Sequence, residues 1–455
     1  MKNISCNSWG GIDKLSLAYT TKPSRSLFGE VSVPGDKSIS HRALIFSALA
    51  DGKSHITGLN SGDDLVRSVN ALKNLGVKIN WHGSNTCIVN GVGDKGFSQP
   101  RQPIDFGNSG TSARLFIGAL ASQPINVRML GDESLQRRPM RRVTKPLESM
   151  GALFCDTQSH RLPLAMTGSK LRGLSYRLPM PSAQVKSAIL IAGLKADGET
   201  EVIEPIQTRD HTERMLQHYG AELDIIREQD CSFIRIRGGQ SLRAADFEVP
   251  GDPSAAMFIA AAALIVPGSE IIIKNVCWNP TRCAAFQVLK QMGADIEVTN
   301  HKAFSGEEAV DLRVKYSTLR GVCTLPENSA ILIDEFPILA ILAAFANGDT
   351  RLSNLRELRF KESDRFAAIV KGLRACGVLV SVEGEDIIVH GRGPEEVSGM
   401  AMIDSQSDHR IAMSFIILGL ASHHPVTVRD IQMIATSFPL FLKSLKNLGA
   451  MIKNT

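Results

Sequence analysis

Aromatic residues, long apolar runs and paired cysteines are all scarce in this chain of 455 residues. Phe, Trp and Tyr together make up 5% of the sequence, too few for the stacked aromatic surfaces that bind single-stranded nucleic acid. The net charge is only +5 and the basic residues are spread along the chain. A nucleic-acid-binding protein is therefore not expected.

The longest apolar run, Ala255 to Val266, ends at Pro267 and is far shorter than the ~20 residues that cross a membrane. The N-terminal MKNISCNSWGGIDKLS lacks the apolar segment of a secretory signal. Eight cysteines occur without any CxxC pair, so neither a disulfide framework nor a metal site is expected. These features predict a cytoplasmic protein of two or three domains with ordinary hydrophobic cores.

One local pattern recurs six times. In each copy a segment with Leu or Met on one helical face is followed by Gly and then by a β-like run, as in ALKNLGVKI and VLKQMGADI. The glycines lie about seventy residues apart and suit the left-handed position that ends a helix. They are Gly76, Gly151, Gly220, Gly293, Gly377 and Gly449.

A second set of six segments alternates with the first. These segments, such as SGTSARLFIGALAS and DPSAAMFIAAAALIVPG, are apolar on nearly every side, so we expect six buried helices. The repeating unit is strand-helix-strand-helix-strand, which predicts an α/β (α+β) chain. VPGDPS at Val249 echoes VPGDKS at Val33. We therefore expect two similar three-unit domains, residues 34–248 and residues 1–33 plus 249–455, linked by two crossover segments.

The stretch VPGDKSISHRA begins the first of these buried helices. Pro-Gly-Asp occurs in both echoes and predicts a turn whose Asp or Ser caps a helix. The second echo has Pro253 where the first has Lys37, so the fold does not require lysine and Lys37 is a candidate for chemistry. The spacing does not match GxxxxGK[ST], which excludes a P-loop. An anion site is still favoured, because a helix N-terminus carries free N–H groups and partial positive charge.

Polar residues also stand at the starts of other buried helices, including Ser182 and Asp334. Ordinary capping explains Ser, Thr and Asp there. It does not explain Lys37, Arg42 and Arg410, because a charge that enters an apolar helix needs a partner. Together with charged residues before the other helices, these predict a cleft for more than one anionic group; the others are Arg137, Arg138, Arg209, His211, Lys361, Glu362, Asp364 and Arg365.

At these positions the chain resembles the 5-enolpyruvylshikimate-3-phosphate (EPSP) synthase family of enolpyruvyl transferases. The resemblance covers nearly the whole chain and is closest in style to the bacterial branch associated with glyphosate-tolerant forms. It is carried by PGDKSISHRA, GNSGTSARL, GDESLQRRPM, SAQVKSAIL, TRDHTERML, IDEFPILA, KESDRF and DHRIAMS. It implies two domains, each of three βαβαββ units, with the active site in the cleft between them.

The resemblance also implies an activity of the shikimate pathway, which leads to chorismate and the aromatic amino acids. The enolpyruvyl (carboxyvinyl) group of phosphoenolpyruvate is transferred to the 5-hydroxyl of shikimate 3-phosphate, and phosphate is released. The implied protein is a monomer without cofactor or metal, with glyphosate as an inhibitor to be considered.

Residues matching the family motifs acquire expected roles. Shikimate 3-phosphate is expected to contact Lys37, Ser38, Arg42, Ser182, Ala183, Gln184, Arg209, Asp334 and Lys361. Phosphoenolpyruvate is expected to contact Lys37, Gly110, Arg138, Gln184, Arg365 and Arg410. The expected catalytic groups are Asp334, which accepts the hydroxyl proton, and Glu362 with Lys37, which handle the proton on carbon. Neighbouring cations should hold the pKa of Glu362 low while the site is empty.

Two departures from the family pattern bear on the site. Thr436 and Ser437 stand before the C-terminal Phe-Pro, where the enteric branch has a lysine, so that cationic contact to phosphoenolpyruvate is not carried over to this chain. Gly110 keeps the small residue that tolerant forms tend to replace with Ala. The alternative function is that of a UDP-N-acetylglucosamine 1-carboxyvinyltransferase, a family that carries a reactive Cys in the loop corresponding to GDESLQRRPM; this loop has none.

Overall fold

Each predicted repeat forms one small sheet in a computed structural model, which describes residues 17–155 and 160–455. Five of the described sheets have four strands, and the sheet of the fifth repeat has three. In the four-stranded sheets the strand that follows the buried helix pairs in parallel with an edge strand, and the other pairings are antiparallel. This is the pattern of a βαβαββ unit. Residues 1–33 were expected to join the second domain, and of these, residues 1–16 lie outside the described residues.

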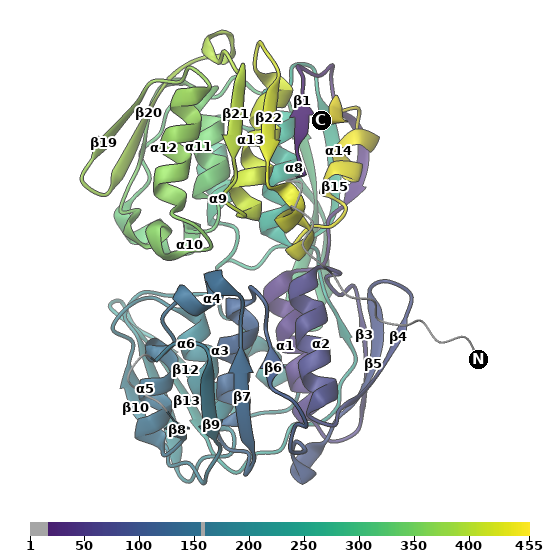
Figure 1. Cartoon of the computed structure of the whole chain (residues 1–455), viewed down its shortest axis with the longest axis vertical. Helices are drawn as coiled ribbons and strands as arrows, with labels where there is room; N and C mark the ends of the chain where they lie inside the picture. The colour runs from purple at the N-terminus through teal and green to yellow at the C-terminus, as the bar shows by residue number, and fades with distance from the viewer. Residues whose placement is uncertain (1–16, 156–159) are drawn as a thin grey trace, which may run out of the picture.

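Three repeats form the lower lobe of the molecule (Figure 1). The first contains α1 (Lys37–Leu49), β3 (Lys53–Thr57), α2 (Asp63–Asn74), β4 (Lys78–His82) and β5 (Thr86–Asn90). The second contains β6 (Ile104–Asp105), α3 (Gly110–Leu120), β7 (Asn126–Leu130), α4 (Glu133–Arg137), α5 (Arg141–Met150), β8 (Leu153–Cys155) and β9 (Leu164–Thr167). The third contains β10 (Ser175–Arg177), α6 (Ala183–Gly193), β11 (Glu199–Glu204), α7 (His211–His218), β12 (Leu223–Arg227) and β13 (Ser232–Arg237), after which β14 (Phe247–Glu248) returns to β3.

The upper lobe holds the other three repeats and the N-terminal strands (Figure 1). The fourth contains β2 (Phe28–Ser32), α8 (Pro253–Ile265), β15 (Glu270–Cys277), α9 (Ala284–Gln291), β16 (Asp295–Phe304) and β17 (Glu307–Lys315). The fifth contains α10 (Ser329–Leu332), α11 (Phe336–Ala344), β18 (Asn347–Leu352), α12 (Arg365–Ala375), β19 (Val380–Glu383) and β20 (Asp386–Arg392). The sixth contains β21 (Ala401–Asp404), α13 (His409–Ala421), β22 (Val426–Arg429), α14 (Phe441–Asn447), β23 (Ile452–Asn454) and β1 (Tyr19–Thr21).

The alternating apolar segments form the buried helices that the sequence predicts. α8 and α11 are buried at every residue, and α1, α3, α6 and α13 at most. Helices α3 and α6 pack so closely that position 118 of α3 must be glycine. A Cβ there would lie 2.5 Å from the carbonyl oxygen of Ala188 in α6. Two separate hydrophobic cores result, one in each lobe. Among the described residues, no helix is long and apolar enough to span a membrane.

The two Pro-Gly-Asp turns meet at the junction of the lobes. The amide of Asp36 donates to the carbonyl of Pro250, and the amide of Asp252 donates to the carbonyl of Pro34, each over 2.8 Å. Each aspartate also caps its own helix, Asp36 on α1 and Asp252 on α8. Arg282 pairs with both carboxylates, at 2.8 and 2.9 Å. The structural role predicted for these turns is confirmed, and they aim the starts of two buried helices at one gap.

The six repeat glycines all have positive φ, between 84° at Gly377 and 114° at Gly151. Left-handed backbone disfavours residues with a Cβ by roughly 1–2 kcal/mol. Gly293 isolates this effect, because a Cβ there would meet nothing nearer than the Thr318 carbonyl at 3.7 Å.

Gly293→Ala should therefore lower the free energy of unfolding by about 1–2 kcal/mol without changing activity. Urea denaturation measures the change, and Lys290→Ala, an exposed position on the preceding helix α9, is the matched control. Equal unfolding curves for Gly293→Ala and the wild type would contradict the left-handed assignment.

Candidate active site

The starts of buried helices from both lobes surround one cavity of about 220 Å³ between the lobes. Most of the predicted site residues line it: Lys37, Ser38, Arg138, Ser182, Ala183, Gln184, Arg209, Asp334, Lys361, Glu362 and Arg410. Residues more than 350 positions apart in the sequence, such as Lys37 and Arg410, thus share a single hollow. Arg42, Gly110 and Arg365 were also predicted but are not part of the lining. Arg137, His211 and Asp364, predicted for the same cleft, do not line it either, and Arg137 and Asp364 form exposed ion pairs with Glu133 and Arg359.

The lower lobe contributes the first turns of α1 and α6. Lys37 Nζ lies 3.0 Å from Asp64 Oδ2, and the Ser182 hydroxyl caps α6 by accepting the Val185 amide. The Gln184 amide accepts from Arg114 at 2.6 Å and donates to Thr111 at 2.9 Å. These bonds fix the side chain of Gln184 at the cavity wall.

Asp334, from the upper lobe, is surrounded by four cations. Its carboxylate lies 2.6 Å from Arg209 of the lower lobe, 3.6 Å from Lys361, 3.6 Å from Arg365 and 3.8 Å from Arg410. Burial alone would raise the pKa of Asp334, but these cations hold it well below its usual range. These cations therefore keep Asp334 ionised.

Glu362 has a similar environment. Its carboxylate accepts from Arg365 at 2.6 Å and lies 3.6 Å from Arg138 of the lower lobe. Burial again acts to raise the pKa of Glu362, yet the arginines hold it well below its usual value. The prediction that neighbouring cations hold the pKa of Glu362 low is confirmed.

Arg365 and Arg42 lie behind the cavity wall. Arg365 is buried between Asp408 at 2.8 Å, Glu362 at 2.6 Å and Asp334 at 3.6 Å. Arg42 donates to the hydroxyls of Ser187 and Thr212 and to the Ser38 carbonyl. Both arginines hold lining residues in place, and their predicted contacts with substrate remain predictions.

Gly110 also lies just behind the lining, at the first turn of α3. A Cβ there would meet Nη1 of Arg114 at 3.0 Å and Nη1 of Arg138 at 3.1 Å. Its small size therefore sets the position of two arginines.

Several lining residues escaped the sequence analysis. Arg114 lies within the quoted motif GNSGTSARL, and its charge in an otherwise apolar helix was the available signal. Arg142 pairs with Glu357 across the cleft at 3.1 Å, a contact no local pattern reveals. Thr436 bonds the Met433 carbonyl, and neither it nor Ser437 lines the cavity.

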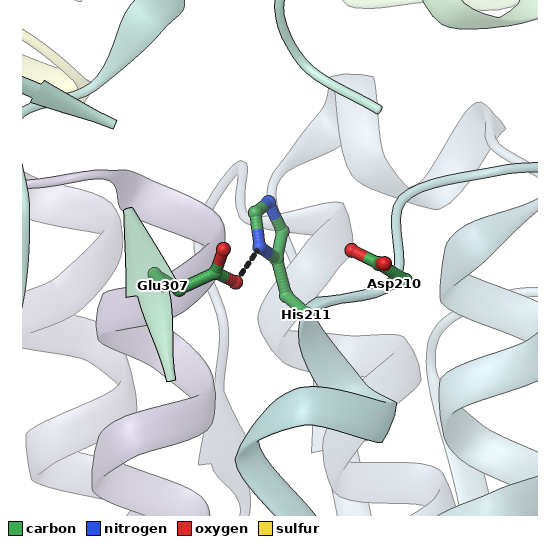
Figure 2. A group of neighbouring side chains, drawn as sticks. All are labelled: Asp210, His211 and Glu307. Atoms are coloured by element: carbon green, nitrogen blue, oxygen red, sulfur yellow. Dashed lines mark hydrogen bonds and ion pairs between the residues drawn. The ribbon is translucent and has the colours of Figure 1, made fainter. Parts of the chain in front are cut away.

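Three potential metal ligands also meet at the junction of the lobes, although no such cluster was expected. Figure 2 shows His211 between Glu307 and Asp210, and His211 Nδ1 lies 2.6 Å from Glu307 Oε1. The sequence hides this group because Glu307 belongs to the other lobe. Asn279 donates to both carboxylates, at 2.7 and 2.8 Å, and Arg214 lies 3.0 Å from Asp210. These donors already contact the carboxylate oxygens of Asp210 and Glu307. The group therefore fits a set of hydrogen bonds that joins the two lobes better than a cation site.

Residues 21–445 match the family model described as EPSP synthase (3-phosphoshikimate 1-carboxyvinyltransferase). The chain belongs to the EPSP synthase family. A 3-phosphoshikimate 1-carboxyvinyltransferase of Parvibaculum lavamentivorans is 49% identical over 95% of this chain and 96% of its own length. One from Brucella abortus is 48% identical with the same coverage, 95% and 96%.

Solved structures agree with this family assignment. The EPSP synthase from Acinetobacter baumannii has a TM-score of 0.86 at 41% identity, covering 96% of this chain and 100% of that one. The enolpyruvyl transferase NikO from Streptomyces tendae, with a TM-score of 0.77 at 18% identity over 97% and 99% of the chains, shares the fold. The predicted two-domain α/β fold and the predicted enzyme, a 3-phosphoshikimate 1-carboxyvinyltransferase of aromatic amino acid biosynthesis, are confirmed over the UDP-N-acetylglucosamine alternative.

Arg365→Met should destabilise this EPSP synthase family member by about 3–5 kcal/mol at neutral pH, because it leaves buried carboxylates without their cation. Burial acts to raise the pKa of Asp408, but Arg365 lowers it, and the net result is a pKa below the usual value. The wild type therefore gains stability from this pair above the unfolded pKa and loses it as pH falls through the folded pKa. The deficit of the variant should therefore shrink as the pH falls below about 4, the pKa of Asp in an unfolded chain.

Denaturation at a series of pH values measures this difference. Arg356→Met, which breaks an exposed pair with Glu385 at 3.7 Å, is the control and should cost less than about 1 kcal/mol. A deficit for Arg365→Met that is independent of pH would show that the arginine acts through packing alone.

Proposed function

We propose that this EPSP synthase holds shikimate 3-phosphate mainly on the lower lobe and phosphoenolpyruvate across the gap to the upper lobe. The residues that contact shikimate 3-phosphate are Lys37, Ser38, Arg42, Ser182, Ala183, Gln184, Arg209, Asp334 and Lys361. Those that contact phosphoenolpyruvate are Lys37, Gly110, Arg138, Gln184, Arg365 and Arg410. The observation that carries it is the convergence of cations from both lobes on Asp334 in one cavity.

Electrostatics supports this division. Both substrates are polyanions that repel one another, and bidentate arginines with lysines can offset their carboxylate and phosphate charges together. The same cations are partnered by Asp334 and Glu362. Substrate anions therefore enter a site whose donors are already held in position, which reduces the reorganisation that binding requires.

The reaction needs two proton transfers before phosphate leaves. The oxygen of the 5-hydroxyl of shikimate 3-phosphate bonds to C2 of phosphoenolpyruvate, and Asp334 accepts the proton of that hydroxyl. Glu362 and Lys37 deliver a proton to the methylene carbon of phosphoenolpyruvate. The C–O bond to phosphate then breaks as Glu362 or Lys37, having delivered its proton, takes one back from that carbon, and the electron pair of the C–H bond restores the double bond. The pKa values of Asp334 and Glu362 are too low for this in the empty cleft. Bound anions offset the cations and raise both toward a useful range.

We also infer four properties of this chain from its sequence. The domain boundaries are those expected, residues 34–248 and residues 1–33 plus 249–455, and the two hydrophobic cores divide the chain close to these positions. The protein acts as a cytoplasmic monomer. No cofactor takes part. Glyphosate, an anion carrying a carboxylate and a phosphonate, competes for the phosphoenolpyruvate cations.

Asp334→Ala should lower kcat by about 10²–10⁴-fold, the usual contribution of a positioned general base. Phosphate release from phosphoenolpyruvate with shikimate 3-phosphate as acceptor measures this, and Asp349→Ala, an exposed carboxylate on the same lobe, is the control. Near-normal turnover by Asp334→Ala would contradict the assigned role. Phosphate release with UDP-N-acetylglucosamine, but not shikimate 3-phosphate, as acceptor would contradict the function itself.

Gly110→Ala should raise KM for phosphoenolpyruvate and weaken inhibition by glyphosate. The new methyl group would force Arg114 and Arg138 aside by a few tenths of an ångström, and misplacement of this kind costs roughly ten-fold in a precisely oriented site. KM for shikimate 3-phosphate should rise less, because Arg138 is assigned to phosphoenolpyruvate alone, whereas Gln184, which Arg114 holds, is shared by both substrates. Equal rises in both KM values would contradict the separation of the two half-sites.

A further inference from the structure

A lysine buried inside the lower lobe is held by two glutamates. Lys186 Nζ lies 3.0 Å from Glu204 Oε2 and 2.7 Å from Glu213 Oε1, and its side chain is 0% exposed. The three residues come from α6, the end of β11 and the first turn of α7. Two carboxylates against one ammonium leave this triad with a net charge of −1, which is costly in a buried position unless another cation balances it.

Arg42, on the neighbouring helix α1, is a buried positive charge that no carboxylate among the described residues pairs with directly. Its guanidinium is buried and bonds neutral groups: Nε to the Thr212 hydroxyl at 2.7 Å, Nη2 to the Ser187 hydroxyl at 2.7 Å and Nη1 to the Ser38 carbonyl at 2.9 Å. Within the described part of the chain, no carboxylate lies within ion-pair distance of it.

Arg42 and the triad are linked through adjacent residues of two helices. Arg42 donates to Thr212, which precedes Glu213 on α7. It also donates to Ser187, which follows Lys186 on α6. Burial lowers the pKa of Arg42 to about 10, and the charge of Glu213 is the foremost opposing influence.

The charge of Asp36 also opposes that lowering. Asp36 is paired with Arg282 at 2.8 Å, as Glu213 is with Lys186 at 2.7 Å, and the influence of Asp36 on Arg42 is the smaller of the two. Lys186, Arg42, Glu204 and Glu213 together carry two positive and two negative charges, which sum to zero.

This group lies directly beneath the proposed shikimate 3-phosphate half-site. Arg42 holds the carbonyl of Ser38, which lines the cavity. Lys186 is on the helix whose first turn carries Ser182 and Gln184. Glu204 accepts from both the amide and the hydroxyl of Thr208, the residue before Arg209.

We propose that Lys186, Glu204 and Glu213 act as positioning residues for shikimate 3-phosphate by balancing the charge of buried Arg42. The inference rests on the proposed half-site. It assigns a role in substrate affinity to residues that do not themselves contact the reacting atoms, and it makes that role depend on the total charge of the group.

A charge-rescue experiment tests it. Lys186→Met leaves the group at −1, so we expect the Kd for shikimate 3-phosphate, measured by calorimetry, to rise roughly ten-fold, a coupling typical of contacting charges. Adding Glu213→Gln restores a sum of zero, and the double variant should return to within about three-fold of wild type. KM for phosphoenolpyruvate should stay within about two-fold in both variants.

The second substitution must be specific. Lys186→Met combined with Glu222→Gln, an exposed glutamate beyond α7, is the matched control and should show no rescue. A double variant Lys186→Met/Glu213→Gln that binds no better than Lys186→Met would overturn the proposal, because it would show that the triad acts through packing. If Lys186→Met does not fold, recovery of folded, substrate-binding protein in the double variant supports the proposal and continued failure overturns it.

One further arm separates this inference from the half-site on which it rests. Arg209→Ala removes a lining residue without touching the buried group, and it should weaken shikimate 3-phosphate binding. If Arg209→Ala binds normally, the half-site assignment is wrong. If it binds weakly while Lys186→Met binds normally, the half-site stands and the positioning role of the triad is wrong.

Discussion

The cations of the cleft must be held together before any substrate arrives, and this requirement explains much of the structure around them. Mutual repulsion would drive Arg209, Arg365 and Arg410 apart if no anion stood between them. Asp334 is that anion for all three. The carboxylates of the cleft thus have two functions: they keep the empty site assembled, and they become acid and base groups once substrate anions take over the cations.

The repeated architecture places these charges. Each buried helix starts near the junction of the lobes, so backbone N–H groups and side chains from distant repeats face one hollow. The paired Pro-Gly-Asp turns, held by Arg282, fix the base of that hollow. His211 and Glu307 add a second link between the lobes (Figure 2). A site built from two lobes can therefore bring together cations that a single repeat could not hold.

Much of this was available from the sequence because it is encoded locally. Helix-ending glycines such as Gly293 and the apolar segments fixed the repeat, and charged helix starts pointed to the cleft. What the sequence did not show is direction and distance. Arg42 and Arg365 occupy motif positions, yet they face inward to Ser187 and Asp408. Contacts between lobes, such as Arg142 with Glu357, depend on chain closure over more than two hundred residues and leave no local pattern.

The central claim is that substrate anions replace Asp334 and Glu362 as partners of the cleft cations. A crystal structure with shikimate 3-phosphate and phosphoenolpyruvate bound tests it most directly. The account predicts that Arg209 and Lys361 contact shikimate 3-phosphate, that Arg138 and Arg410 contact phosphoenolpyruvate, and that the distances from Asp334 to its present cations lengthen. Substrates bound outside this cavity, or an unchanged set of ion pairs around Asp334, would contradict the account.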